Sequence, residues 1–148
     1  MLVVGVAMLA LVVAVGRAGA GRPSVRHTCS ATDRHFIERT QVNMESLGYW
    51  SASLADGQAE PAQVIRQTKV AARSVDATRP TDPTLKQTRQ ILRLMLTEYW
   101  QAVSARTDDR DSGIHMMRAY GLANFAHDLL AQAQPALASK GCPVDALL

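Results

Sequence analysis

Between Ser30 and Gly57, apolar residues recur at helical spacing. They are three or four residues apart, which places their side chains on one face of an α-helix. Ser30 followed three residues later by Asp33 resembles a capping box, so we expect the helix to begin there and to end at Asp56-Gly57. The predicted buried stripe consists of Ile37, Thr40, Met44, Leu47, Ser51 and Leu54.

Two further helices have clear start signals. Pro61 opens the second, which we expect to end before Pro80 because a proline disfavours helical geometry in the residue ahead of it. Asp82-Pro83 predicts the start of the third, with an N-cap and a proline at the first helical position. The predicted buried positions are Val64, Thr68, Ala71 and Val75 in the second helix, and Leu85, Thr88, Ile91, Leu92, Leu94, Met95, Leu96, Tyr99, Ala102 and Val103 in the third.

A polar segment, residues 107–113, separates the third helix from a fourth. Pro135 lies inside the fourth pattern, and because a proline interrupts the helical hydrogen bonds, we expect a kink or an end near Gln134. Gly141 then suits a C-cap, and Pro143 prevents the helix from continuing. The predicted buried stripe is His115, Ala119, Leu122, Ala126, Leu129, Ala133 and Ala136.

These four helices and their short connections predict an all-α fold, an up-down-up-down four-helix bundle in a single domain over residues 21–148. In that topology the first helix starts where the last one ends. Cys29 and Cys142 are the only two cysteines and flank the helical region, so we predict a disulfide between them. It would close a loop of about 113 residues and contribute roughly 4–5 kcal/mol in the chain-entropy model.

The N-terminal segment predicts export. Fourteen consecutive residues, Leu2–Val15, are apolar or glycine, and Ala18-Gly19-Ala20 follows soon after. This pattern is typical of a secretory signal peptide cleaved after Ala20. No basic residue precedes the apolar run, so an uncleaved membrane anchor over residues 1–20 is the alternative. Either way the rest of the chain is expected to be extracytoplasmic, secreted or tethered to the outer face of the cytoplasmic membrane, with membrane contact only through residues 1–20 if they remain.

Composition and motifs argue against several functions. The formal charge of the chain is +3, and its basic residues are scattered along the sequence, which disfavours nucleic-acid binding. Zinc-protease, haem-attachment, phosphate-loop and nucleophile-elbow motifs are missing from the sequence. No glutamate is followed by histidine three residues later, so a di-iron site of the bundle type is not expected. We therefore predict that the protein is not an enzyme and has no cofactor.

Methionine and histidine side chains offer one alternative chemistry. Thioether and imidazole groups are suitable ligands for Cu(I), so an extracytoplasmic helical protein rich in them is a plausible copper carrier. A polar row on the fourth helix, which includes Tyr120, Asn124 and His127, has the composition to hold haem or a polar ligand, although it is more typical of a hydrogen-bonded surface or interface. Methionine also fills gaps in helical cores. The candidate metal ligands are His115, Met116, Met117, Met44, Met95 and His127.

Two aromatic pairs, Tyr49-Trp50 and Tyr99-Trp100, are candidates for partner binding. Adjacent residues on a helix point about 100° apart, so one member of each pair is expected to face the core and the other to face outward. Exposed tyrosine and tryptophan are common at protein interfaces. The leading hypothesis is a non-enzymatic, exported or tethered helical-bundle protein that binds a protein partner or acts as an accessory subunit in the cell envelope. A copper or haem carrier is the alternative.

Overall fold

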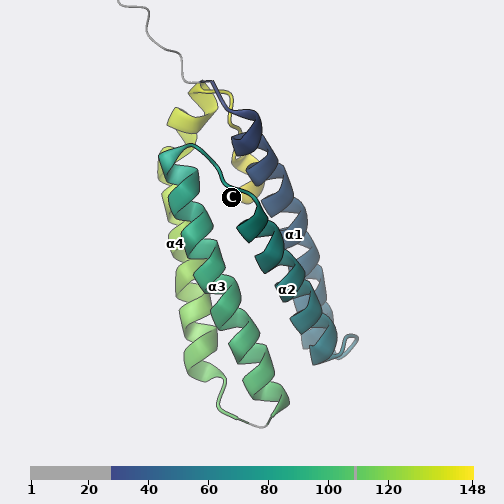
Figure 1. Cartoon of the computed structure of the whole chain (residues 1–148). Coiled ribbons are helices and arrows are strands. Elements are labelled where there is room, and N and C mark those ends of the chain that lie inside the picture. Colours follow the sequence, from purple (N-terminus) through teal and green to yellow (C-terminus); the bar gives the residue numbers. More distant parts are fainter. Residues whose placement is uncertain (1–27, 109) are drawn as a thin grey trace, which may run out of the picture.

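The computed structural model describes residues 28–108 and 110–148, and within them the chain is helical without strands (Figure 1). The all-α, four-helix prediction is confirmed. The predicted signal peptide or anchor, residues 1–20, lies outside the described residues. Among the described helices, none is long and apolar enough to cross a membrane. The elements are α1 (Ala31–Ala55), α2 (Pro61–Ala77), α3 (Pro83–Thr107), α4 (Gly113–Ser139) and the short 3-10 helix η1 (Asp145–Leu147).

The start of each of the first three helices follows its sequence signal. The hydroxyl oxygen of Ser30 accepts a hydrogen bond from the backbone N–H of Asp33 (3.0 Å) and caps α1. Asp82 caps α3 by accepting the backbone N–H groups of Thr84 and Leu85. Pro61 occupies the first position of α2, where its missing N–H costs nothing.

The end of α4 departs from one prediction and agrees with another. The helix continues through Pro135 to Ser139, so the predicted end near Gln134 is wrong. The helix stops at Gly141, as predicted, because that residue adopts the left-handed conformation (φ 79°) that favours glycine. The next residue, Cys142, donates its N–H back to the carbonyl of Leu137 (2.9 Å).

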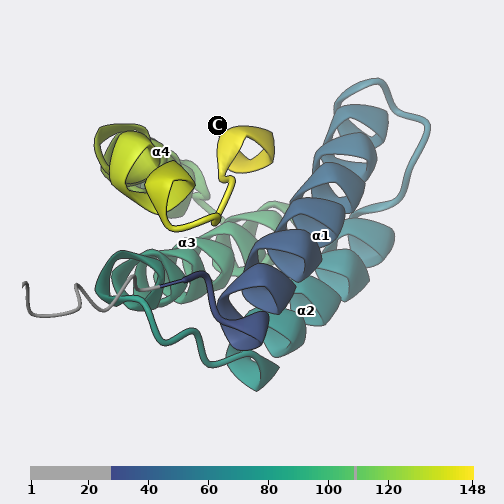
Figure 2. The same cartoon turned by 90° about the horizontal axis from the view of Figure 1, so that it is seen from above.

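The helices pack in sequence order, with α1 against α2, α2 against α3, and α3 against α4. In contrast to a closed bundle, α1 and α4 do not pack along one another, and the C-terminal segment with η1 lies between them (Figure 2). Val144 in that segment is fully buried, and Leu147 packs against the core. Residues that follow the last helix therefore replace direct contact between the first and last helices.

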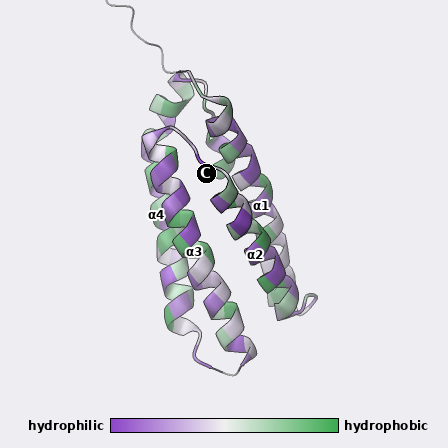
Figure 3. Ribbon diagram, viewed as in Figure 1, coloured by the Kyte–Doolittle hydropathy of each residue, from purple (hydrophilic) through white to green (hydrophobic). Residues whose placement is uncertain are grey.

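The core is close to the predicted stripes in α2 and α3. All four predicted positions of α2 are buried. In α3 the exceptions are Leu94, which is 58% exposed, and Met95 and Tyr99, which are half-buried. The fully buried Phe36 of α1 lies beside its predicted stripe and was not expected. As Figure 3 shows, hydrophobic and hydrophilic residues share each helix, as expected for elements with one buried face.

In α4 the buried face differs from the predicted one towards the C-terminal end. The buried residues there are Leu130 and Leu137, whereas Leu129 and Ala133 are only half-buried and Ala136 is exposed. The C-terminal half of α4 contacts η1 as well as α3, and this second contact shifts the buried face. A helical stripe read from sequence assumes a single packing direction.

Candidate functional site

A groove lies on the side of the molecule where α1 and α4 stand apart, and α3 forms its floor. Two hollows open along it. One, of about 330 Å³, is next to the C-terminal segment, and the other, of about 570 Å³, lies where α1 ends and α4 begins. We refer to both together as the α1–α4 groove, which is lined by Met44 and Leu54 of α1, Met95 and Tyr99 of α3, and Met116 and Ala123 of α4.

The hollow next to the C-terminal segment is mainly apolar. Met44, Met95 and Leu130 line its walls, and Leu147 of η1 lies against them. Thr40 also lines it, and the hydroxyl oxygen of Thr40 is buried without a hydrogen-bond partner among the described residues. A buried hydroxyl normally has a partner. Because that oxygen is itself buried, it offers no contact to an occupant, and the hollow suits an apolar group.

The second hollow is bounded by a polar bridge. The phenolic O–H of Tyr99 on α3 donates to the hydroxyl oxygen of Ser51 on α1 (2.6 Å). Leu54, Val103 and Met116 provide apolar lining from three helices. The bridge holds α1 at a fixed distance from the floor, so the groove is a preformed feature of the fold.

Helix α4 exposes an unusual amount of apolar surface. It packs along α3 and makes only a small contact with η1, whereas a helix that is apolar on several sides normally packs against a second helix. Met116, Ala123 and His127 line the groove, and Tyr120, which lies four residues after Met116 on the same side of α4, is 69% exposed. Exposed apolar patches of this kind mark interaction sites. The large exposed residues of α4 are Ile114, Met116, Met117, Tyr120 and Phe125.

The two aromatic pairs are placed differently. In the first pair Tyr49 is 67% exposed, while Trp50 is half-buried against the core, and their rings meet edge to face (5.5 Å). This matches the expected division into outward and inward members. In the second pair both rings are half-buried, with Tyr99 in the groove and Trp100 beneath the ammonium group of Lys69 (5.3 Å). Partner binding by these four residues stays a prediction.

The predicted metal ligands are dispersed. Met44, Met95 and His127 line one hollow, whereas Met116 lines the other and Met117 is 69% exposed. The imidazole Nδ1 of His115 lies 2.7 Å from a carboxylate oxygen of Glu98. Over residues 28–108 and 110–148, no group of three His, Cys, Asp or Glu side chains is arranged to hold a metal ion. The six residues therefore do not form one site, although three of them meet at one hollow.

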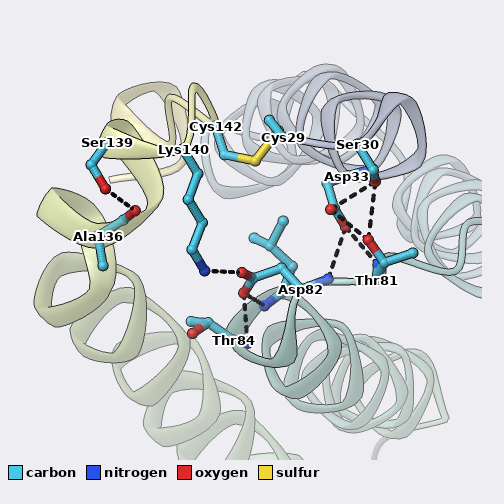
Figure 4. Close-up of polar contacts among 11 residues, drawn as sticks. Cys29, Ser30, Asp33, Thr81, Asp82, Thr84, Ala136, Ser139, Lys140 and Cys142 are labelled. Atoms are coloured by element: carbon cyan, nitrogen blue, oxygen red, sulfur yellow. Dashed lines mark hydrogen bonds and ion pairs between the residues drawn. A yellow bond between two sulfur atoms is a disulfide. The ribbon is translucent and has the colours of Figure 1, made fainter. Parts of the chain in front are cut away.

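A polar cluster surrounds the disulfide at the end of the molecule where α1 begins and α4 ends (Figure 4). Cys29 and Cys142 are bonded, with Cα atoms 5.1 Å apart, so the predicted pairing is confirmed. The buried carboxylate of Asp33 accepts the backbone N–H groups of Thr81 (2.6 Å) and Asp82 (3.1 Å). Its second oxygen accepts the hydroxyl groups of Ser30 and Thr81, both at 2.7 Å.

The charges of this cluster are stabilised by their surroundings. Burial by itself raises the pKa of Asp33, but the hydrogen bonds from Ser30, Thr81 and Asp82 outweigh it and lower the pKa to about 2. Burial likewise raises the pKa of Asp82, and the ammonium group of Lys140 (2.7 Å) together with backbone N–H groups brings it below its ordinary value. Both carboxylate oxygens of Asp33 are engaged in hydrogen bonds, so the cluster is structural. It ties the α2–α3 connection to the start of α1 through Asp33 and to the end of α4 through Lys140.

Sequence reasoning missed two features of these sites. Asp33 was recognised as a cap residue, but its contacts with Thr81 join residues 48 positions apart. The second missed feature is the groove between α1 and α4, where the C-terminal segment packs in place of a direct helix contact. The sequence signal for it is the pair of apolar residues Val144 and Leu147 after the last helix.

Comparison of the chain with protein-family models, with curated proteins and with solved structures finds no match. No relative therefore assigns a role to any residue. The groove and the exposed apolar side of α4 are the features from which a function is inferred.

Proposed function

We propose that this chain is a non-enzymatic, exported binding protein of the cell envelope, and that its α1–α4 groove holds an apolar helical segment of a partner protein. The observation that carries the proposal is the groove itself, apolar in its lining and bordered by exposed apolar residues of α4. The disulfide is compatible with an extracytoplasmic location, where such bonds persist.

The C-terminal segment supports the kind of occupant proposed. It places Leu147 on the groove-lining residues as part of a short helix, with Asp145 bound by the side chain of Gln134 on α4. An apolar helical segment with a polar outer side thus already fits one part of the groove. A partner would occupy the adjoining part in the same manner.

The dimensions agree with this mode of binding. Between Met44 and Leu54 the groove follows ten residues of α1, a length of about 15 Å, or roughly three turns of a bound helix. Helix-in-groove recognition uses a few apolar anchors at helical spacing against a preformed apolar surface. Met116 and Tyr120 on the rim provide exposed apolar surface for such anchors.

A photo-crosslinking experiment in the producing cells tests the proposal. Benzoylphenylalanine is placed at Tyr120, which shares one side of α4 with the groove-lining Met116, and, as the matched control, at Phe125, an exposed aromatic residue on another side of α4. We expect the Tyr120 position to join one defined envelope protein and the Phe125 position to fail to do so. Equal crosslinking of the same protein from both positions would refute the groove assignment.

Replacing either of two alanines by arginine then tests whether the groove itself is required. Ala123 is exposed and lines the first hollow, while Ala136 is exposed on α4 outside it. Ala123→Arg should reduce the Tyr120 crosslink at least tenfold by placing a charge in the apolar groove, and Ala136→Arg should leave it unchanged. If both variants melt like the wild type and crosslink equally, the partner binds elsewhere.

The meeting of Met44, Met95 and His127 at one hollow favours a second candidate function, the transport of Cu(I). His115 and His127 are twelve residues apart on α4, about 18 Å along the helix, so they do not form an axial pair for haem. Titration with a Cu(I)–acetonitrile complex, which needs no thiol reductant, tests the copper candidate. Stoichiometric binding that Met95→Leu abolishes and Met117→Leu retains would favour it, and the lack of binding would exclude it.

A further inference from the structure

The charge of the protein is concentrated on two adjacent helices. Helices α2 and α3 together contain seven basic and two acidic residues, a net charge of +5. Helices α1 and α4 together contain three basic and four acidic residues, a net charge of −1. The formal charge of +3 for the whole chain therefore conceals a strong asymmetry between the two halves of the fold.

Six basic side chains lie on these two packed helices, and we call them together the basic face. Its members are Arg66, Lys69 and Arg73 on α2 and Lys86, Arg89 and Arg93 on α3. Asp76 of α2 joins the two rows, since its carboxylate pairs with Arg93 (2.5 Å) and Arg89 (3.5 Å) across the helix boundary. Lys69 of α2 lies over the ring of Trp100 on α3. The view in Figure 3 looks onto these two helices, which carry hydrophilic bands along their length.

Several of these cations form no ion pair with a described residue. Arg66, Arg73 and Lys86 are exposed, and no ion pair involves them within the described part of the chain. A shallow hollow of about 440 Å³ is lined by Arg66, Lys69 and Arg73. Asp76 also lines it, and its carboxylate is already paired with Arg89 and Arg93. Three cations around one hollow suit an anionic group of the size of a lipid phosphate. Such unpaired charges contribute little to folding and are available to a ligand.

The surroundings of the basic face favour a membrane over a nucleic acid. Two aliphatic side chains on the same helices are exposed, Val70 (42%) and Leu94 (58%). Basic residues combined with exposed apolar ones are typical of surfaces that lie in the headgroup region of anionic membranes. Sequence-tolerant nucleic-acid sites instead present aromatic rings for base stacking, and here the ring of Trp100 is covered by Lys69.

We propose that the basic face of α2 and α3 docks the protein onto the surface of an anionic phospholipid bilayer. The contact is peripheral and reversible, and its residues are separate in sequence from the apolar N-terminal segment. The cations approach the phosphate groups, and Val70 and Leu94 enter the boundary between headgroups and acyl chains. The docking is independent of the α1–α4 groove, since no residue of the basic face lines either of its hollows.

Vesicle partitioning of the full-length, oxidised protein tests the proposal. The partition coefficient is measured on vesicles of phosphatidylcholine alone and of phosphatidylcholine with 30% phosphatidylglycerol, at low and at high salt. The segment Leu2–Val15 is present with both vesicle types, so the ratio of the two coefficients isolates the contribution of charge. We expect a ratio above about a hundredfold at low salt, falling towards one at high salt.

A matched pair of triple variants locates the contact. Arg66→Gln/Arg73→Gln/Lys86→Gln removes three exposed charges from the basic face, and Arg34→Gln/Arg39→Gln/Arg118→Gln removes three exposed charges from α1 and α4. At about fivefold per charge, the first variant should lower the ratio about a hundredfold, and the second by only a few fold. Equal losses in both variants, or a ratio near one for the wild type, would overturn the proposal.

A DNA-binding measurement distinguishes the membrane explanation from a nucleic-acid explanation. The wild type and both variants are mixed with a short DNA duplex at the same salt concentrations. Weak binding that the two variants reduce equally is expected from the net charge alone. Tight duplex binding that only the basic-face variant loses would assign the face to nucleic acid and overturn the membrane proposal. Circular-dichroism melting of each variant verifies that it is folded.

Discussion

Replacing Asp33 by asparagine tests how the fold is tied together at the disulfide end. Asparagine has the shape of aspartate but offers a single acceptor oxygen and an NH₂ group. In the wild type four donors converge on the two carboxylate oxygens, from Ser30, Asp82 and both the backbone and the side chain of Thr81. In Asp33→Asn the amide oxygen can still accept the two backbone N–H groups, while the NH₂ group faces the hydroxyls of Ser30 and Thr81, which must then accept instead of donate. Hydrogen bonds to a charged carboxylate are thus replaced by weaker neutral ones.

The lowered pKa sets the expected magnitude. Asp33 has a pKa of about 2 in the fold against an ordinary value of 3.8, and each unit of difference corresponds to about 1.4 kcal/mol. Ionised Asp33 therefore stabilises the fold by about 2 kcal/mol at neutral pH. Because the folded pKa is the lower one, this contribution is complete above pH 4–5 and disappears as the pH falls from 3.8 towards 2. The weaker neutral hydrogen bonds of the variant add to the loss.

Urea unfolding at pH 7 and pH 2, with the disulfide intact, measures the effect. Asp33→Asn should lower the free energy of unfolding by about 2–4 kcal/mol at pH 7, and the difference from the wild type should shrink markedly at pH 2. Asp56→Asn is the control, since Asp56 is exposed and its side chain makes no hydrogen bond among the described residues. A variant as stable as this control, or a difference independent of pH, would show that the cluster does not hold the α2–α3 connection.

Three further experiments test the core and the ends of the helical region. Cys29→Ala/Cys142→Ala should lower the free energy of unfolding by about 4–5 kcal/mol in chemical denaturation, because the disulfide closes a long loop. Leu96→Ala should cost about 2–5 kcal/mol and Leu94→Ala less than about 0.5, since the first leucine is 1% exposed and the second 58%; similar losses would contradict the α3 packing. Gly141→Ala should lower the melting temperature by an amount equivalent to about 1 kcal/mol, because alanine is strained at φ 79°.

The helices were predictable because their signals are local. A cap such as Ser30 or Asp82, a proline at the first position and a glycine with positive φ each act within one or two turns. The buried stripes of α2 and α3 were predictable for a related reason. Each packs between two helices, and its buried residues still fall on one helical stripe, so the periodic pattern identifies them.

The features with functional interest were not predictable because they depend on distant residues. The gap between α1 and α4 exists because the chain turns back after Cys142 and inserts Leu147, a tertiary outcome with no periodic signal. Arg66 and Arg93 are far apart in sequence, so their charges looked scattered until antiparallel packing placed them on one surface. The sequence shows Asp33 only as part of the α1 cap. Its contacts with Thr81 join residues 48 positions apart, which no local pattern indicates.

The two proposed contacts occupy different sides of one small fold. The basic face lies on α2 and α3, while the groove opens between α1 and α4, where Figure 2 places the C-terminal segment. A bilayer bound to Arg66 and Arg73 would therefore leave Tyr120 on the groove rim accessible to a partner protein. The protein would then act as an adaptor, with the bilayer and the partner bound together. Since no residue is shared between the two surfaces, loss of one contact by substitution should leave the other intact, and a partner crosslink at Tyr120 should survive removal of the basic charges.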